Sequence, residues 1–152
     1  MKYYLNQKDF EITIIAAKFN KFINEKLIDG AKNTLINVGK ISNKNIKKIW
    51  VPGVYEIPLI CDIVSEKKKS SAVIAIASII EGETKHAKYI AQSCFLQISN
   101  ISVKYQIPIS CAILTVKNLN QAFERSGGKF GNRGSEAAYS VLEMIDTIEK
   151  IK

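Results

Sequence analysis

Apolar runs of strand length alternate along the chain with segments of helical periodicity. Four runs rich in Ile, Val and Ala predict β-strands, at residues 11–17, 46–51, 72–79 and 108–115. The last two are apolar nearly throughout, which is typical of strands whose sheet is covered by helices on both faces. The pattern therefore predicts a buried sheet.

Between and after these strands, apolar residues recur at helical spacing. Residues 24–39 and 85–104 are two such segments, with Gly39 as the expected stop of the first. After the fourth strand, Asn118 is the expected N-cap of a short helix that ends at Gly127. The apolar stripe of the segment 24–39 consists of Leu27, Ala31, Leu35 and Val38. Near the end of the chain a second stripe, of Ala138, Leu142, Ile145 and Ile148, predicts a further helix.

Alternating strands and helices predict a parallel sheet with right-handed crossovers, and hence a three-layer αβα sandwich of the α/β class. No linker or repeat interrupts residues 1–152, so a single domain is expected. In such folds ligands bind beyond the carboxyl ends of the strands. The segments that follow the four strands are therefore the first places to look for chemistry.

Composition narrows the class of protein. With 47% hydrophobic and 24% charged residues the chain is typical of a soluble globular protein, and no apolar run reaches the roughly 20 residues that span a bilayer. The start, MKYYLNQKDF, lacks the apolar core of a signal peptide. Three cysteines lie far apart in apolar segments, so free thiols, no zinc site and a cytoplasmic location are expected.

The net charge of +8 raises the possibility of nucleic-acid binding, but its distribution argues against it. Only two of the 22 basic residues are arginines, and the lysines are scattered along the chain. The one dense cluster, Lys67–Lys69, falls where a helix is expected to end, and cations stabilise a helix C-terminus.

Both arginines lie in the segment ERSGGKFGNRG, residues 124–134, together with four of the eight glycines. Arginine binds phosphate or carboxylate through two parallel hydrogen bonds, and glycine turns expose backbone N–H groups. The segment therefore indicates phosphate binding. A flexible inter-helix loop with incidental arginines is the alternative.

The stretch EGETKHAKYI, residues 81–90, holds the only histidine, His86, where the third strand leads into a helix. Free N–H groups and the positive end of the helix dipole make this turn a natural anion site, and Thr84 is expected to cap the helix. Histidine transfers protons near neutral pH. A solvated first-turn histidine is the alternative.

Two further strand ends carry candidate residues. In VPGVYEIP, residues 51–58, Glu56 is expected to point into the ligand crevice, unless it only favours the following helix N-terminus. After the first strand, Phe19 could stack on a planar ring, or could form a hydrophobic staple instead.

Over nearly its whole length the chain resembles one family, lumazine synthase. The resemblance rests on six motifs in order: FN, VPGVYEIP, GETKH, ILT, QAFERSGGKFGNRG and EAA…EM. The resemblance implies a flavodoxin-like fold with a four-stranded parallel sheet. It also implies condensation of 5-amino-6-(D-ribitylamino)uracil with 3,4-dihydroxy-2-butanone 4-phosphate to 6,7-dimethyl-8-ribityllumazine, phosphate and water, in riboflavin biosynthesis. No metal and no organic cofactor would be needed.

Carried over position by position, the resemblance implies residue roles. His86 would transfer protons. Glu83 and Thr84 would bind the phosphate, and Arg125 would clamp it. Phe19 would stack on the pyrimidine ring. The aminouracil would also be bound by the backbone of Val54 and Tyr55, and by Glu56, Ser78, Ile79, Ile80, Cys111 and Arg133.

In this family the site lies between subunits of a pentamer, so the resemblance implies that Cys111, Arg125 and Arg133 come from the adjacent chain. Some members assemble twelve pentamers into an icosahedral shell, and the compact loop SGGKFGNRG favours that form here. Whether a shell would enclose riboflavin synthase as a partner stays open. No nucleic-acid or membrane partner is expected.

Three positions depart from the family pattern. Cys111 stands where an aromatic residue is common, and Arg133 stands where lysine is usual. Glu81 replaces a frequent arginine and is expected to face away from the phosphate. The alternative to the enzyme is a non-catalytic homologue that binds a lumazine or flavin or only forms a shell. The presence of His86, Arg125 and Glu56 together argues against it, because a pure shell would need none of them.

Overall fold

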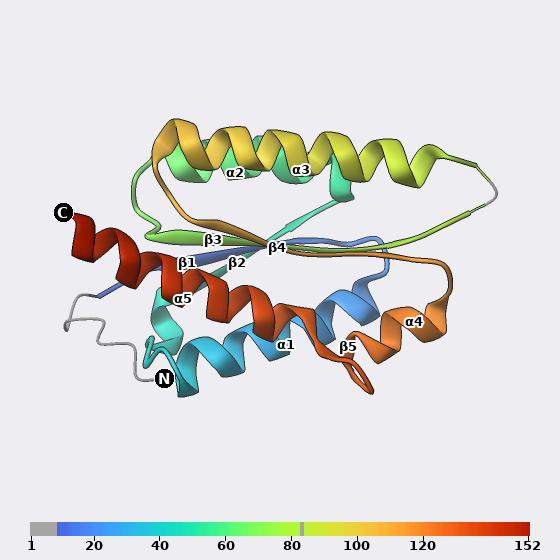
Figure 1. Cartoon of the computed structure of the whole chain (residues 1–152), viewed down its shortest axis with the longest axis horizontal. Helices are drawn as coiled ribbons and strands as arrows, with labels where there is room; N and C mark the ends of the chain where they lie inside the picture. Colours follow the sequence, from blue (N-terminus) through green and yellow to red (C-terminus); the bar gives the residue numbers. More distant parts are fainter. Residues whose placement is uncertain (1–8, 83) are drawn as a thin grey trace.

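The computed structural model of the protein describes residues 9–82 and 84–152. Strands and helices alternate along it as the apolar pattern predicts (Figure 1). The main strands are β1 (Ile12–Ala17), β2 (Ile46–Val51), β3 (Ala72–Ile80) and β4 (Ile109–Val116). The α-helices are α1 (Lys21–Asn37), α2 (Ile57–Glu66), α3 (His86–Tyr105), α4 (Leu119–Glu124) and α5 (Arg133–Ile151).

The four main strands form one parallel sheet in the order β2-β1-β3-β4, which confirms the predicted α/β class and the flavodoxin-like architecture. In register, Ile12 lies opposite Ile46 on one side and Ala72 on the other. Because all strands run in the same direction, their carboxyl ends meet at one edge of the sheet, where the loops to the following helices lie (Figure 1).

Helices cover both faces of the sheet, with α1 and α5 on one face and α2 and α3 on the other (Figure 1). Successive residues of a strand serve opposite layers, so Ile14 packs in the core under α1 and α5 while Ile15 packs in the core under α2 and α3. The predicted helix stripes point into the first core, including Leu27 and Leu142, both fully buried.

The segment between α4 and α5 differs from the prediction. Asn118 caps α4 as expected, its Oδ1 accepting the N–H of Gln121 at 2.9 Å, but the helix ends at Glu124 and not at Gly127. Residues that follow form a small antiparallel hairpin of β5 (Ser126–Gly128) and β6 (Gly131–Asn132). Two glycines give the hairpin the positive φ that it needs: Gly127 (119°), at the register shift within β5, and Gly131 (79°), the first residue of β6.

Two short 3₁₀ turns, η1 (Asn43–Asn45) and η2 (Val54–Glu56), flank β2. Lys67–Lys69 follows the end of α2, as predicted. Within residues 9–82 and 84–152, no helix combines the length and apolar character that crossing a membrane requires.

Candidate functional site

A cavity of about 410 Å³ opens beyond the carboxyl ends of β1, β2 and β3. The turn after β1, the 3₁₀ turn η2, the end of β3 and the first turn of α3 all contribute to its wall. The lining residues are Phe19, Gly53, Val54, Tyr55, Glu56, Ser78, Ile79, Ile80, Gly82, Thr84, His86, Ala87 and Ile90. Three of the four segments that the sequence singled out, including the turn at Phe19, therefore meet around one space.

Most of the predicted site residues lie in that wall. Four lining residues were not predicted, namely Gly53, Gly82, Ala87 and Ile90. Ile90 could have been found, because it lies four residues after His86 on the same face of the helix. Three predicted residues, Cys111, Arg125 and Arg133, do not line the cavity. Glu83 lies outside the described residues.

Phe19 projects from the turn between β1 and α1, and its side chain is 74% exposed. Asn20, the N-cap of α1, has a φ of 58°, which turns the chain sharply from strand into helix. A hydrophobic staple would need an apolar partner four residues after the N-cap, but Asn24 stands there. The ring is thus presented to the cavity and can stack on a planar ligand.

Glu56 lies at the cavity and also closes the turn before α2. Its Oε2 accepts the N–H of Gly53 at 2.9 Å, which closes the η2 turn before α2. The half-buried side chain also lines the cavity. A carboxylate has several acceptor positions, so Glu56 can hold the turn and still accept hydrogen bonds from ligand hydroxyl groups.

His86 is the first residue of α3, and its side chain is exposed at the cavity. Thr84 was expected to cap this helix, but the N-cap is Lys85, without a side-chain cap. Within residues 9–82 and 84–152, the Thr84 hydroxyl makes one hydrogen bond, accepting the His86 N–H at a long 3.4 Å. The first turn of α3 therefore keeps N–H groups available to an anion, with an imidazole beside it.

Ser78, Ile79 and Ile80 form the end of β3 below the cavity. The Ser78 side chain is turned into the fold, since its Oγ donates to Asn24 Oδ1 at 2.7 Å. Glu81 is exposed and does not line the cavity, in keeping with its expected orientation.

The cavity wall contains no Lys or Arg among the described residues. Arg125 is half-buried at the end of α4, and no described residue forms an ion pair or hydrogen bond with its guanidinium group. Arg133 begins α5 and pairs with Glu136, Nη1 to Oε2 at 2.6 Å. Cys111 lies on the edge strand β4, where burial raises the pKa of its thiol to about 11.

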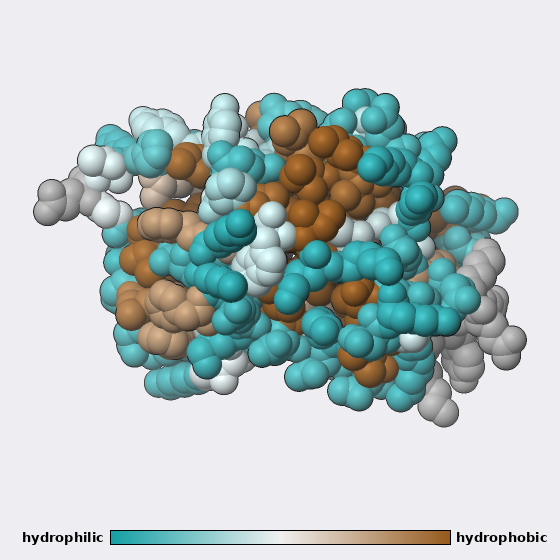
Figure 2. All heavy atoms as spheres, turned by 180° about the vertical axis from the view of Figure 1, so that it is seen from behind, coloured by the Kyte–Doolittle hydropathy of each residue, from teal (hydrophilic) through white to brown (hydrophobic). Residues whose placement is uncertain are grey.

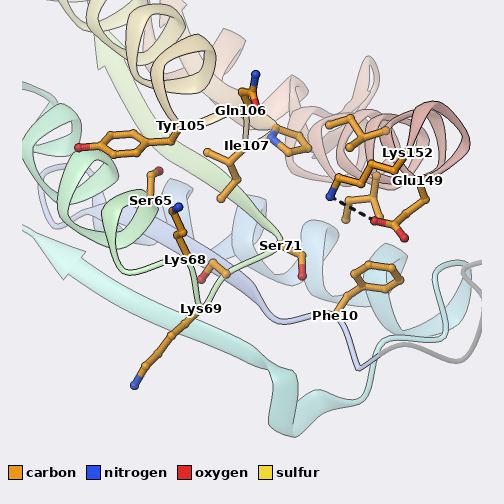
Figure 3. Close-up of a pocket in the computed structure, with 14 residues that line it drawn as sticks. Phe10, Ser65, Lys68, Lys69, Ser71, Tyr105, Gln106, Ile107, Glu149 and Lys152 are labelled. Carbon is orange, nitrogen blue, oxygen red and sulfur yellow. Dashed lines mark ion pairs between the residues drawn. The ribbon is translucent and has the colours of Figure 1, made fainter.

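A second cavity, of about 260 Å³, lies at the opposite edge of the sheet, near the amino ends of the strands (Figure 3). Lys68 reaches toward Ser65 there, whereas Lys69 points away from the cavity (Figure 3). Lys152 pairs with Glu149 at 3.6 Å. The helices α2, α3 and α5 end at this edge, and their C-terminal carbonyls disfavour an anion. With no histidine in its wall, this cavity is the weaker candidate for the active site.

The described residues contain no group of three or more His, Cys, Asp or Glu side chains placed to hold a metal ion. The first cavity brings together an imidazole, a carboxylate, an aromatic ring and the N–H groups of a helix start. That set suits proton transfer on a ligand that has a planar ring, hydroxyl groups and an anionic end.

A sequence model of the family described as 6,7-dimethyl-8-ribityllumazine synthase matches residues 9–149. Curated proteins named 6,7-dimethyl-8-ribityllumazine synthase are similar over almost their full length. One from Buchnera aphidicola subsp. Schizaphis graminum is 49% identical, covering 97% of this chain and 93% of its own. One from Wigglesworthia glossinidia brevipalpis is 46% identical over 97% and 96%, and one from Yersinia pestis is 41% identical over 93% and 90%.

Proposed function

The chain belongs to the 6,7-dimethyl-8-ribityllumazine synthase family, and from this premise we propose how its site works. The enzyme is a transferase that condenses 5-amino-6-(D-ribitylamino)uracil with 3,4-dihydroxy-2-butanone 4-phosphate, releasing phosphate and water, in riboflavin biosynthesis. The uracil amine attacks the ketone and gives an imine with loss of water. Phosphate then leaves, the enol tautomerises, and the ring closes with loss of a second water.

The aminouracil occupies the part of the cavity next to β1 and η2. Phe19 stacks on the pyrimidine ring, and the Glu56 carboxylate accepts hydrogen bonds from ribityl hydroxyl groups. The backbone of Val54 and Tyr55 and the strand end Ser78, Ile79 and Ile80 complete this half. Support comes from the exposure of the Phe19 ring and from the presence of all these residues in one wall.

The phosphate of the second substrate binds at the first turn of α3, where Thr84, and Glu83 through its backbone, contribute hydrogen bonds. His86 stands beside it and transfers the protons that imine formation, phosphate loss and ring closure require. Holding both reactants together supplies much of the remaining rate, since oriented pairs reach effective molarities of about 10⁵ M or more.

One chain offers this dianion no cationic side chain, because no Lys or Arg lines the described cavity wall. We therefore assign Arg125, with Arg133 and Cys111, to the site of a neighbouring copy of the chain. An arginine without a partner among the described residues is available to clamp a phosphate in that way. A site shared between copies is built at an interface between subunits, and a head-to-tail interface whose rotation closes gives a ring. As in the family that the sequence resembles, we propose a homopentamer.

The layer of α2 and α3 exposes large apolar side chains, including Leu59 at 64%, Leu96 at 61% and Val103 at 76%. Figure 2 shows hydrophobic side chains gathered on the upper part of the face seen from behind. Exposed apolar surface of this kind favours contact with further copies. We propose that residues 1–152 form one domain of a cytoplasmic oligomer and that the tight β5–β6 hairpin suits a shell of sixty chains, which could enclose riboflavin synthase.

The gathering of Phe19, Glu56, Thr84 and His86 around one cavity carries this proposal. It is tested by mixing the purified protein with both substrates and following the fluorescence of the lumazine product, corrected for the uncatalysed condensation. His86→Ala is expected to lower kcat by roughly 10²-fold, and to keep some activity by proximity alone. Lys88→Ala, an exposed residue of the same helix outside the cavity wall, is the matched control. A wild-type rate equal to the uncatalysed rate would overturn the proposal.

A further inference from the structure

The turn that carries Phe19 is held by a buried amide outside the cavity wall. Asn24, in the first turns of α1, is fully buried. Its Nδ2 donates to the carbonyl of Ala17 at 2.7 Å and to that of Phe19 at 3.0 Å. Its Oδ1 accepts the hydroxyl of Ser78, from the end of β3, at 2.7 Å. One side chain therefore joins the ends of β1 and β3.

Further hydrogen bonds hold the turn between β1 and α1 to the ends of β2 and β3. Asn20 Nδ2 donates to the Ser78 carbonyl at 2.8 Å. The N–H groups of Lys18 and Phe19 donate to carbonyls at the end of β2, at 2.7 and 3.2 Å, those of Val51 and Pro52. The backbone on both sides of the ring is thus fixed, although the ring itself is mostly exposed and has little packing to hold it.

Only an amide satisfies this position. It must donate to two carbonyls and accept from one hydroxyl, and Asn does so through its NH₂ and C=O groups. Alanine would leave these buried groups unpaired, and an ionised aspartate, although of the same shape, would present acceptors to two carbonyl oxygens. Both changes act on the backbone of Phe19 and on Ser78, two residues of the cavity wall.

We propose that Asn24 is a positioning residue for the aminouracil, setting the direction of the Phe19 ring over the end of β3. This inference rests on the proposed function of the cavity. Thr84 lies in the loop after β3 and His86 begins α3, and no hydrogen bond joins either residue to Asn24 among the described residues. Replacing Asn24 should therefore weaken binding of the aminouracil and not of the butanone phosphate.

The test is steady-state kinetics on the whole protein, varying each substrate in turn. Asn24→Ala is expected to raise the KM for the aminouracil roughly tenfold and to leave the KM for the butanone phosphate nearly unchanged, with Asn24→Asp at least as severe. The control is Thr13→Val, which breaks another buried side-chain bond of β1, Thr13 Oγ1 to Ser70 Oγ at 2.6 Å, away from the cavity. It is expected to lower stability and to keep both KM values.

Equal rises in both KM values, or an unchanged aminouracil KM in Asn24→Ala, would overturn the positioning role and leave Asn24 a structural residue. If Asn24→Ala does not fold, Ser78→Ala, which removes only the Ser78 hydroxyl bond, takes its place with the same split at smaller size. A wild type no faster than the uncatalysed mixture is a different failure, because it overturns the proposed function and not this inference alone.

Discussion

Arg125 shows at the scale of one residue why an arginine stands out in a chain rich in lysine. Its planar group can grip a phosphate with two parallel hydrogen bonds, and no described residue competes for it. Within its own chain, however, it lies away from the cavity. The role proposed for it depends on a second copy of the chain.

Arg125→Ala is expected to raise the KM for the butanone phosphate roughly 10- to 100-fold, the cost of losing a charge-assisted hydrogen-bond pair. The KM for the aminouracil should change little. Substrate-saturation kinetics measure the split, and Lys129→Ala, a cation of the neighbouring hairpin turn, serves as the control. Loss of aminouracil affinity alone would place Arg125 in the other half of the site.

The three thiols also make a prediction at this scale. Burial raises the pKa of the Cys111 thiol to about 11 and that of Cys94 to about 12, and it raises the pKa of Cys61 still further. Neighbouring thiols add smaller increases to the pKa of Cys94 and of Cys61. In the unfolded chain these groups ionise near their ordinary value of 9.0. The folded state therefore binds more protons above that pH, and its stability should fall as pH rises from about 9 towards 11.

Denaturant midpoints across that pH range, together with thiolate absorbance of native and unfolded protein, check this expectation. Native thiolate should appear well above the pH at which the unfolded chain ionises. Coinciding titrations of the two states would contradict the burial argument.

Among the elements, α1 and α5 pack closely, and the contact depends on glycine. A Cβ at Gly134, in the first turn of α5, would meet the backbone carbonyl of Leu27. Asn132 adds to the same contact by capping α5 at Gly134 N and donating to Lys26 O at 3.0 Å. The loop that carries both arginines is therefore fixed to α1 at this point.

Gly134→Ala is expected to destabilise the protein by about 3 kcal/mol or more, because the added Cβ would clash with backbone atoms, which cannot move aside as the end of a side chain can. The clash outweighs the roughly 1 kcal/mol by which alanine stabilises a helix relative to glycine. Urea denaturation measures it. Gly82→Ala, where an added Cβ meets nothing within 4 Å, should leave the midpoint nearly unchanged. Similar midpoints for the two variants would contradict the packing argument.

At the scale of the whole molecule, the sequence predicts the sheet well and the site in part. The strands are recognisable because helices cover both faces and leave them apolar, as in β3. The hairpin β5–β6 was missed because three- and two-residue strands carry no periodicity. The role of Asn24 was missed because its partner Ser78 is 54 residues away and only folding brings the two together.

The central claim concerns two copies of the chain. If His86 and Arg125 serve the same site from different copies, chains carrying His86→Ala and chains carrying Arg125→Ala should restore each other when they are co-assembled. With random mixing in a closed ring, about a quarter of the sites receive both native residues. A mixture of His86→Ala with the His86→Ala, Arg125→Ala double variant contains no intact site and is the matched control.

The measurement that tests the account most directly is therefore the rate of lumazine formation by co-assembled His86→Ala and Arg125→Ala chains. The account predicts recovery towards about a quarter of the wild-type rate, well above either variant alone and above the control mixture. A rate no greater than the average of the two separate variants, in oligomers shown to contain both chains, would mean that one chain holds a complete site and would contradict the shared site proposed for this enzyme.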